Sequence, residues 1–192
     1  MTNPACTPAE PTLFSDDTST PRLDQLAATK YVGVIGSRQL PTAYKEKVKQ
    51  IVELLLAKGY GVASGGAAGA DNYALEALLE LSAAHRGIIF SPWQEIDQFP
   101  IPVRENVKRF IAQGGNVLWG DTPRYAARQT VVAGLLARNR RLIANVVGLV
   151  AFPYGESRGT AFTVQNAKDL PVRIFQSEWG WGKKESCHVR LS

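Results

Sequence analysis

The chain has 192 residues, of which 45% are hydrophobic, so its length suits one domain with a full core and is too short for two large ones. No run approaches the roughly 18 apolar residues of a membrane helix, and the polar N-terminus lacks the charged start and apolar block of a signal peptide. The two cysteines, Cys6 and Cys187, form no pairing pattern and no CxxC motif. We therefore expect a cytoplasmic protein with no membrane contact, no disulfide framework and no zinc site.

The formal net charge is +5 and the isoelectric point is about 9.3, but the basic residues are unevenly placed. Between positions 101 and 141, eight basic residues face only two acids. The basic residues are Arg104, Lys108, Arg109, Arg124, Arg128, Arg138, Arg140 and Arg141. Such an excess indicates a polyanion or a phosphorylated ligand, although a solvated basic surface would give the same count.

Strand and helix patterns alternate along most of the chain. Short apolar runs predict strands at 31–36, 60–64, 87–90, 116–119, 146–152 and 171–175. Helical spacing of apolar residues predicts helices at 42–58, 71–84, 103–113, 130–145 and 159–170. This alternation is typical of an α/β fold of the Rossmann-like, doubly wound type, with a mostly parallel sheet and helices on both faces.

The two ends of the chain differ from this pattern. Residues 1–29 are rich in Pro, Thr, Ser, Asp and Ala without sustained periodicity, which predicts a disordered N-terminal tail. Residues 177–192 are expected to be an irregular C-terminal tail. The Rossmann-like core is therefore predicted to span residues 30–176.

A loop with almost no side chains follows the second predicted strand. The stretch GVASGGAAGAD, residues 61–71, holds four glycines and four alanines and leads into a helix. Backbone N–H groups at such a strand-to-helix turn can hold a phosphate if no Cβ blocks its approach. Phosphate-binding candidates in this loop are Ser64, Gly65, Gly66 and Gly69. Asp71 could cap the helix, orient the loop or accept a bond from a ribose hydroxyl, and capping is the favoured role.

Two further small, polar turns follow strands in the same way. GSR, at Gly36, Ser37 and Arg38, follows the first strand, and GESRGT, residues 155–160, follows the fifth. Because carboxyl ends of parallel strands share one sheet edge, the three turns should line up there. Arg38 would supply a bidentate charge for phosphate. The glycines match neither the dinucleotide fingerprint nor the P-loop, which argues against NAD and ATP chemistry.

The sequence favours binding over catalysis. Its two histidines, His85 and His188, lie outside the three turns, and the hydroxyls of Ser37 and Ser64 have no evident base nearby. No cluster of His, Cys, Asp and Glu has the spacing of a metal site. We expect no catalytic residue, no cofactor and no metal.

Sites for single-stranded nucleic acid, one class of polyanion, join a basic groove to aromatic stacking platforms. Candidates for stacking are Trp93, Trp119, Tyr125, Trp179 and Trp181, the last two beside Lys183 and Lys184. Trp119 lies in a predicted strand and is expected to belong to the core, whereas the segment holding Trp179 and Trp181 could equally cover a sheet edge.

Arginines are concentrated near the end of the fourth predicted helix. The stretch RNRRLIA, residues 138–144, places Arg138 and Arg141 on neighbouring faces and directs Leu142 to the core. No acid occurs between 122 and 155, which favours a ligand or a distant partner for these arginines.

Four segments in order resemble the DprA/Smf family of DNA-processing proteins. They are VIGSR at 34–38, SGGAAGAD at 64–71, RNRRLIA at 138–144 and SRGTAFT at 157–163. The resemblance implies a domain that binds single-stranded DNA, helps load a RecA-type recombinase and forms a homodimer. It also implies a basic phosphate-binding and DNA-binding pocket, made by Gly36, Ser37, Arg38, Ser64, Gly65, Gly66, Gly69, Arg138, Asn139, Arg140, Gly159 and Thr160.

The chain departs from the family pattern in places. Leu75 stands where the family often has a histidine, and the helical and winged-helix domains common in the family are not expected here. The related LOG-type phosphoribohydrolases carry a glutamate where this chain has Thr163, although Glu156 lies nearby in sequence. A nucleotide-binding sensor or a LOG-like nucleotide phosphoribohydrolase remains the alternative function.

Overall fold

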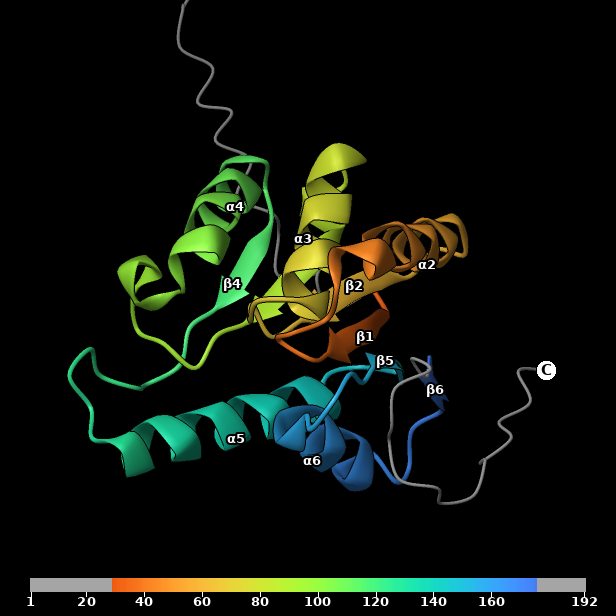
Figure 1. Ribbon diagram of the computed structural model, residues 1–192. Coiled ribbons are helices and arrows are strands. Elements are labelled where there is room, and N and C mark those ends of the chain that lie inside the picture. The colour runs from red at the N-terminus through yellow and green to blue at the C-terminus, as the bar shows by residue number, and fades with distance from the viewer. Residues whose placement is uncertain (1–28, 176–192) are drawn as a thin grey trace, which may run out of the picture.

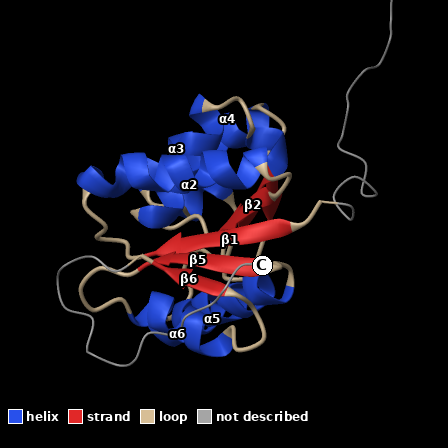
Figure 2. Cartoon of the chain, turned by 90° about the vertical axis from the view of Figure 1, so that its right-hand side faces the viewer, coloured by secondary structure: helices blue, strands red, loops and turns tan. Residues whose placement is uncertain are grey.

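The computed structural model describes residues 29–175, which form one parallel sheet covered by helices on both faces (Figures 1 and 2). The sheet has six strands in the order β4-β3-β2-β1-β5-β6, and every neighbouring pair is parallel. The strands are β1 (Tyr31–Gly36), β2 (Gly61–Ser64), β3 (Gly87–Phe90), β4 (Asn116–Leu118), β5 (Gly148–Phe152) and β6 (Val172–Ile174). The predicted Rossmann-like α/β fold is confirmed, and each strand lies within a predicted range.

Two layers of helices sandwich the sheet, as the view along its edge shows (Figure 2). One layer holds α2 (Lys45–Ala57), α3 (Ala70–Glu80) and α4 (Ile101–Ala112), and the other holds α5 (Arg128–Ala144) and α6 (Arg158–Asn166). All five match the predicted helices, with ends that differ by a few residues. The first turn of the helix predicted from residue 42 is a separate 3-10 segment, Thr42–Tyr44, that follows Pro41.

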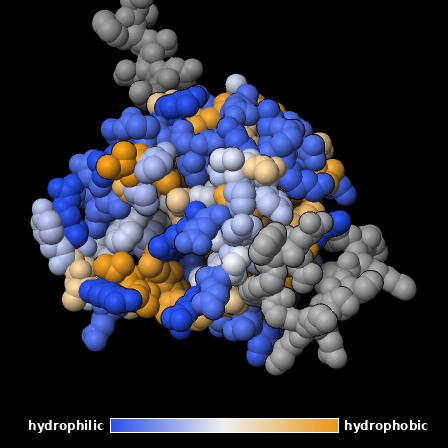
Figure 3. Space-filling view, viewed as in Figure 1, coloured by the Kyte–Doolittle hydropathy of each residue, from blue (hydrophilic) through white to orange (hydrophobic). Residues whose placement is uncertain are grey.

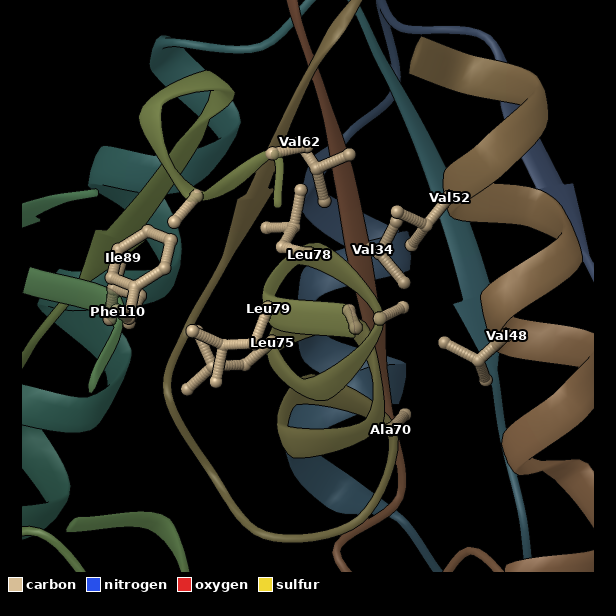
Figure 4. Close-up of a cluster of buried hydrophobic side chains, with 14 of the residues drawn as sticks. Val34, Val48, Val52, Val62, Ala70, Leu75, Leu78, Leu79, Ile89 and Phe110 are labelled. Carbon is tan, nitrogen blue, oxygen red and sulfur yellow. The ribbon is translucent and has the colours of Figure 1, made fainter. Parts of the chain in front are cut away.

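The main core lies between the sheet and the layer of α2, α3 and α4 (Figure 4). Val34 of β1 and Val62 of β2 are almost fully buried against Val52 of α2 and Leu78 of α3. Full burial of an aliphatic side chain of this size stabilises the fold by about 1.5–3 kcal/mol. A second cluster, which includes Ile35, lies under α5 and α6. Central strands buried on both faces explain why their sequences read as continuous apolar runs.

The order of the strands creates a crevice between β1 and β5. From β1 the chain builds β2, β3 and β4 outward on one side, and then α5 carries it back to β5 on the other side of β1. The loops after β1 and β5 therefore lead to helices on opposite faces of the sheet, although Gly36 pairs with Phe152 at the ends of these strands. In open parallel sheets, ligands bind at such a switch point.

The connection from β4 to α5 is fixed to the rest of the sheet edge. The Thr122 N–H donates to the Pro92 carbonyl at 3.1 Å, and the Gln98 side chain donates to the Thr122 carbonyl at 3.0 Å. Trp119 packs edge-on against Phe99, with 6.0 Å between ring centroids, and remains 38% exposed. The expectation that Trp119 belongs to the core is wrong because β4 ends at Leu118 on the outside of the sheet.

Within residues 29–175, no helix is long and apolar enough to cross a membrane. The predicted tails fall almost wholly outside this range, as do Trp179, Trp181, Lys183, Lys184 and His188.

Candidate functional site

A pocket with a volume of about 490 Å³ opens at the crevice between the carboxyl ends of β1 and β5. This size is typical of sites that bind small molecules or single nucleotide units. Its lining comes from the loop after β1, the start of α3, the middle of α5 and the start of α6. The lining residues are Ile35, Gly36, Ser37, Arg38, Gln39, Ala67, Asp71, Val132, Leu135, Leu136, Arg138, Asn139, Glu156, Ser157, Arg158, Gly159, Thr160 and Thr163.

The loop after β1 brings one hydroxyl and one free cation to the pocket. The Ser37 N–H continues the sheet by donating to Phe152 at 3.0 Å, and its hydroxyl accepts the Gln39 N–H at 3.2 Å. Arg38 is exposed and makes no hydrogen bond or ion pair with any residue from 29 to 175. Its guanidinium is therefore available to an anionic ligand.

A glycine at the end of β1 allows this loop to lie close to α3. A Cβ on Gly36 would lie 2.5 Å from the Phe152 carbonyl oxygen and 2.6 Å from the Ala70 Cβ. No real Cβ approaches other atoms so closely, so the loop can keep its place only with glycine at this position.

The glycine loop after β2 holds an anion, but that anion is the carboxylate of Asp71. The Gly65 and Ala67 N–H groups donate to Asp71 Oδ2 at 3.0 and 3.3 Å, and the Gly66 N–H donates to the Ser64 hydroxyl at 3.3 Å. Asp71 lies inside α3, whose N-cap is Gly69. The predicted capping role of Asp71 is thus wrong, and the loop-orienting interpretation is confirmed.

Arg138 of α5 completes the environment of Asp71. Its Nη1 lies 3.4 Å from Asp71 Oδ2, and the two side chains are only 8% and 4% exposed. A Cβ on Gly65 would overlap this Nη1, so only glycine leaves room for the guanidinium. The acid that the sequence near Arg138 lacks is therefore supplied from another helix, 67 positions away.

Burial and pairing act in opposite directions on this ion pair. Burial raises the pKa of the Asp71 carboxyl, whereas the Arg138 charge and the Gly65 and Ala67 N–H groups lower it. Burial likewise lowers the pKa of Arg138, and Asp71 opposes that shift. A guanidinium keeps its proton in proteins, so a permanent positive charge faces the Asp71 carboxyl. The Arg138 Nε is buried without a hydrogen-bond partner among the described residues.

The start of α6 forms another part of the pocket lining. The hydroxyls of Ser157 and Thr160 lie 2.6 Å apart, and the Thr163 hydroxyl donates to the Gly159 carbonyl at 2.8 Å. The first N–H groups of a helix have no partner within it and attract negative charge. Arg158 is exposed at this end and forms no ion pair with any described residue. An anion here would meet helix N–H groups and two arginines.

The predicted site residues divide into two groups. Seven line the pocket, namely Gly36, Ser37, Arg38, Arg138, Asn139, Gly159 and Thr160. Ser64, Gly65, Gly66 and Gly69 lie behind that lining and support it through Asp71 and the β1 loop. Arg140 also lies outside the lining, and its guanidinium stacks on the Phe162 ring at 5.5 Å from the centroid.

Several lining residues were missed by the sequence reasoning. Arg158 and Ser157 stand within the GESRGT turn, and a search for every charge in the three turns would have found Arg158. Val132, Leu135 and Leu136 make an apolar wall from α5, and nothing in their spacing marks them as ligand contacts.

Other candidate chemistry is not assembled at this pocket. His85 lies in the 3-10 turn Ala84–Arg86 before β3, at the amino end of the sheet and thus on the edge opposite the pocket. Within the described range, no group of three or more His, Cys, Asp and Glu side chains could hold a metal ion.

The chain matches a known protein family over most of its length. Residues 21–188 match the model described as DNA recombination-mediator protein A. The chain belongs to this family. The resemblance expected from the four sequence segments is thus confirmed, and no curated protein matches the chain significantly.

Two solved structures from the family share the fold. DNA processing protein A from Helicobacter pylori, whose structural description concerns its single-stranded DNA binding mode, is 24% identical with a TM-score of 0.64. The match covers 81% of this chain and 69% of that one. DprA from Streptococcus pneumoniae is 22% identical with a TM-score of 0.60, over 81% of this chain and 53% of its own length. The chain thus spans about half of the Streptococcus protein.

Proposed function

We propose that the protein binds single-stranded DNA in the pocket at the β1–β5 crevice and acts as a recombination mediator. The observation that carries the proposal is a pair of arginines, Arg38 and Arg158, that face the same pocket without a protein partner among the described residues. Together with the first turn of α6, they offer charge and N–H donors to phosphates. Family membership and the single-stranded DNA binding described for the Helicobacter protein support the same function.

The pocket also offers an apolar surface for a nucleotide unit. Val132, Leu135 and Leu136 of α5 contribute apolar side chains, and Ile35 contributes another from β1. A base can pack on such a surface regardless of its identity, while phosphates are held by arginine. This combination favours binding with little sequence preference.

A LOG-like hydrolase is less well supported. The position of the LOG glutamate is occupied by Thr163, whose hydroxyl donates to the Gly159 carbonyl within α6. Glu156 lines the pocket but precedes the helix. Since no carboxylate stands at the position where the LOG chemistry needs one, we favour binding without hydrolysis.

The proposed role includes partners beyond DNA. By family resemblance, the domain would assemble as a homodimer in the cytoplasm and help load a RecA-type recombinase. The size of the assembly can be measured by light scattering after gel filtration, and loading by the rate at which the recombinase coats DNA held by a single-strand binding protein.

Fluorescence anisotropy of a labelled oligo-dT at several salt concentrations tests the function. We expect the affinity to fall steeply as salt rises, because each phosphate contact releases counterions. Duplex DNA and a panel of mononucleotides serve as competitors. Tighter binding to duplex than to single strands, or binding that salt does not change, would contradict the proposal.

The Arg38→Ala variant should bind oligo-dT about ten- to a hundredfold more weakly, because it removes a charged hydrogen-bond donor to phosphate. The slope of log affinity against log salt should also fall by about 0.7 for each phosphate that the protein no longer neutralises. Arg109→Ala is the matched control, since Arg109 is an exposed arginine on α4, a helix that contributes no residue to the pocket lining, and forms no ion pair with any described residue. Equal affinities for the two variants would show that the pocket is not the DNA site.

A further inference from the structure

A second groove lies on the surface of α5 next to the pocket. Its lining, Arg128, Gln129, Val132, Ala133 and Leu136, comes entirely from the first half of this helix, and its volume is about 370 Å³. Val132 and Leu136 line both this α5 groove and the pocket. The groove therefore borders the pocket at these two side chains, and a ligand that fills the pocket lies next to the groove.

The first half of α5 is an apolar helix surface that the described part of the chain leaves uncovered. The buried residues of α5 all lie in its second half, at Arg138, Asn139 and Leu142. Val132 is 46% exposed although it borders an apolar groove. The space-filling view shows the result as a hydrophobic patch over α5, bordered by hydrophilic side chains (Figure 3). Open apolar surfaces of this kind mark binding sites.

The charge around the groove suits a polyanion. Arg128 is exposed and forms no ion pair with any residue from 29 to 175. No acid occurs between 122 and 155, so no neighbour in sequence neutralises it. If a second copy packed on this face around a twofold axis, the same patch would meet itself and bring unpaired Arg128 side chains to one interface. A nucleic acid strand on this face avoids the repulsion between like charges, because its phosphates pair with the arginine.

The geometry of the helix matches a short stretch of single strand. Arg128, Val132 and Leu136 are spaced by four residues and lie along one stripe. The stripe is about 12 Å long at 1.5 Å per residue, which corresponds to roughly three stacked nucleotides at 3.4 Å each.

We propose that the strand leaves the pocket along the α5 groove, with its bases against Val132 and Leu136 and a phosphate on Arg128. This inference rests on the proposed function, since it extends the same DNA site. The pocket would hold one end of the bound segment, and the groove would add affinity only for strands long enough to reach it.

The path is tested by measuring the affinity for oligo-dT of increasing length. Anisotropy gives this affinity for the wild type, Arg128→Ala and Val132→Asn. Both variants should bind a 20-nucleotide strand about three- to tenfold more weakly. For Arg128→Ala, the shortest strand that the wild type binds should keep its affinity, because Arg128 lies outside the pocket lining, whereas Val132 belongs to both linings. Arg109→Ala and Val147→Asn are matched controls, because Val147 is 42% exposed and lies between the end of α5 and β5, away from the groove. Melting temperatures close to that of the wild type establish that all variants are folded, since surface substitutions change stability little.

The outcomes separate this inference from the function on which it rests. If Arg38→Ala abolishes binding while both groove variants keep wild-type affinity for the long strand, the path is wrong and the pocket stands. If Val132→Asn dissociates an oligomer while Arg128→Ala binds the long strand normally, the face is a contact between copies and the path is again wrong. A wild type that binds no oligo-dT would overturn both proposals.

Discussion

Replacing Arg138 by methionine is expected to lower the free energy of unfolding by about 3–5 kcal/mol, which is the range for breaking a buried ion pair by removing one partner. The variant leaves the Asp71 carboxylate buried, with two loop N–H groups as its remaining donors. Urea denaturation of the wild type and the variant measures the difference. A loss below about 1 kcal/mol would mean that the pair contributes no more than an exposed one.

The double variant Arg138→Met with Asp71→Asn is the control for this prediction. Because it removes the stranded charge, it should recover part of the lost stability. With the Asp71→Asn single variant it completes a cycle that isolates the pairwise contribution. If it is less stable than the single variant, the loss comes from packing around Arg138 and not from the unpaired carboxylate.

The pH dependence gives the same experiment a second readout. Burial raises the pKa of Asp71 above its ordinary 3.8, and without Arg138 one opposing charge is gone, so the pKa rises further. The folded variant then holds the Asp71 proton more tightly than the unfolded chain does. Its stability deficit should be small near pH 3.8 and grow as the pH rises through the folded pKa. The double variant should lack this dependence.

The Gly69→Ala variant is expected to lose about 2–5 kcal/mol of stability and much of its DNA affinity. Gly69 has φ +72° and ψ −128°, a backbone conformation that residues other than glycine rarely adopt. A Cβ there would also overlap the Ser37 carbonyl oxygen and lie 2.8 Å from the Arg38 backbone carbon. The substitution therefore pushes the β1 loop away from α3 and displaces Arg38.

Gly159→Ala provides the matched comparison for Gly69→Ala. Gly159 is in the first turn of α6, has no positive φ, and a Cβ there would meet nothing within 4 Å. This variant should be as stable as the wild type or up to about 1 kcal/mol more stable, since alanine favours helix. Differential scanning calorimetry measures the stability of both variants. An equal loss in the two would show that neither the lack of space nor the backbone conformation at Gly69 causes the effect.

The fold followed from the sequence because parallel strands buried on both faces read as apolar runs such as VVGLVAF, which became β5. The edge that carries the site followed as well, since three strand-to-helix turns must share one edge of a parallel sheet. The sequence could not show which groups within those turns face a ligand. This depends on the partner of each backbone N–H group, and tertiary contacts determine those partners.

Asp71 and Arg138 show this limit most clearly. A glycine loop that binds phosphate and one that binds its own aspartate have the same composition, and only the 3.0 Å bond from Gly65 to Asp71 distinguishes them. The absence of acids near Arg138 in sequence correctly indicated a ligand or a distant partner, but the sequence could not name Asp71. Trp119 was assigned to the core because strand length cannot be read to one residue, and β4 ends just before it.

The Asp71–Arg138 pair joins helices from opposite layers of the sandwich, since α3 covers one face of the sheet and α5 the other (Figure 2). The amides of Gly65 and Ala67 bond to the same carboxylate oxygen that Arg138 approaches. Solvent hydrogen exchange at these two amides would therefore report on the attachment of α5, not only on the loop that contains them. The two layers should open at this edge as one cooperative unit, so that a strand bound along α5 would also slow exchange in the glycine loop behind the pocket.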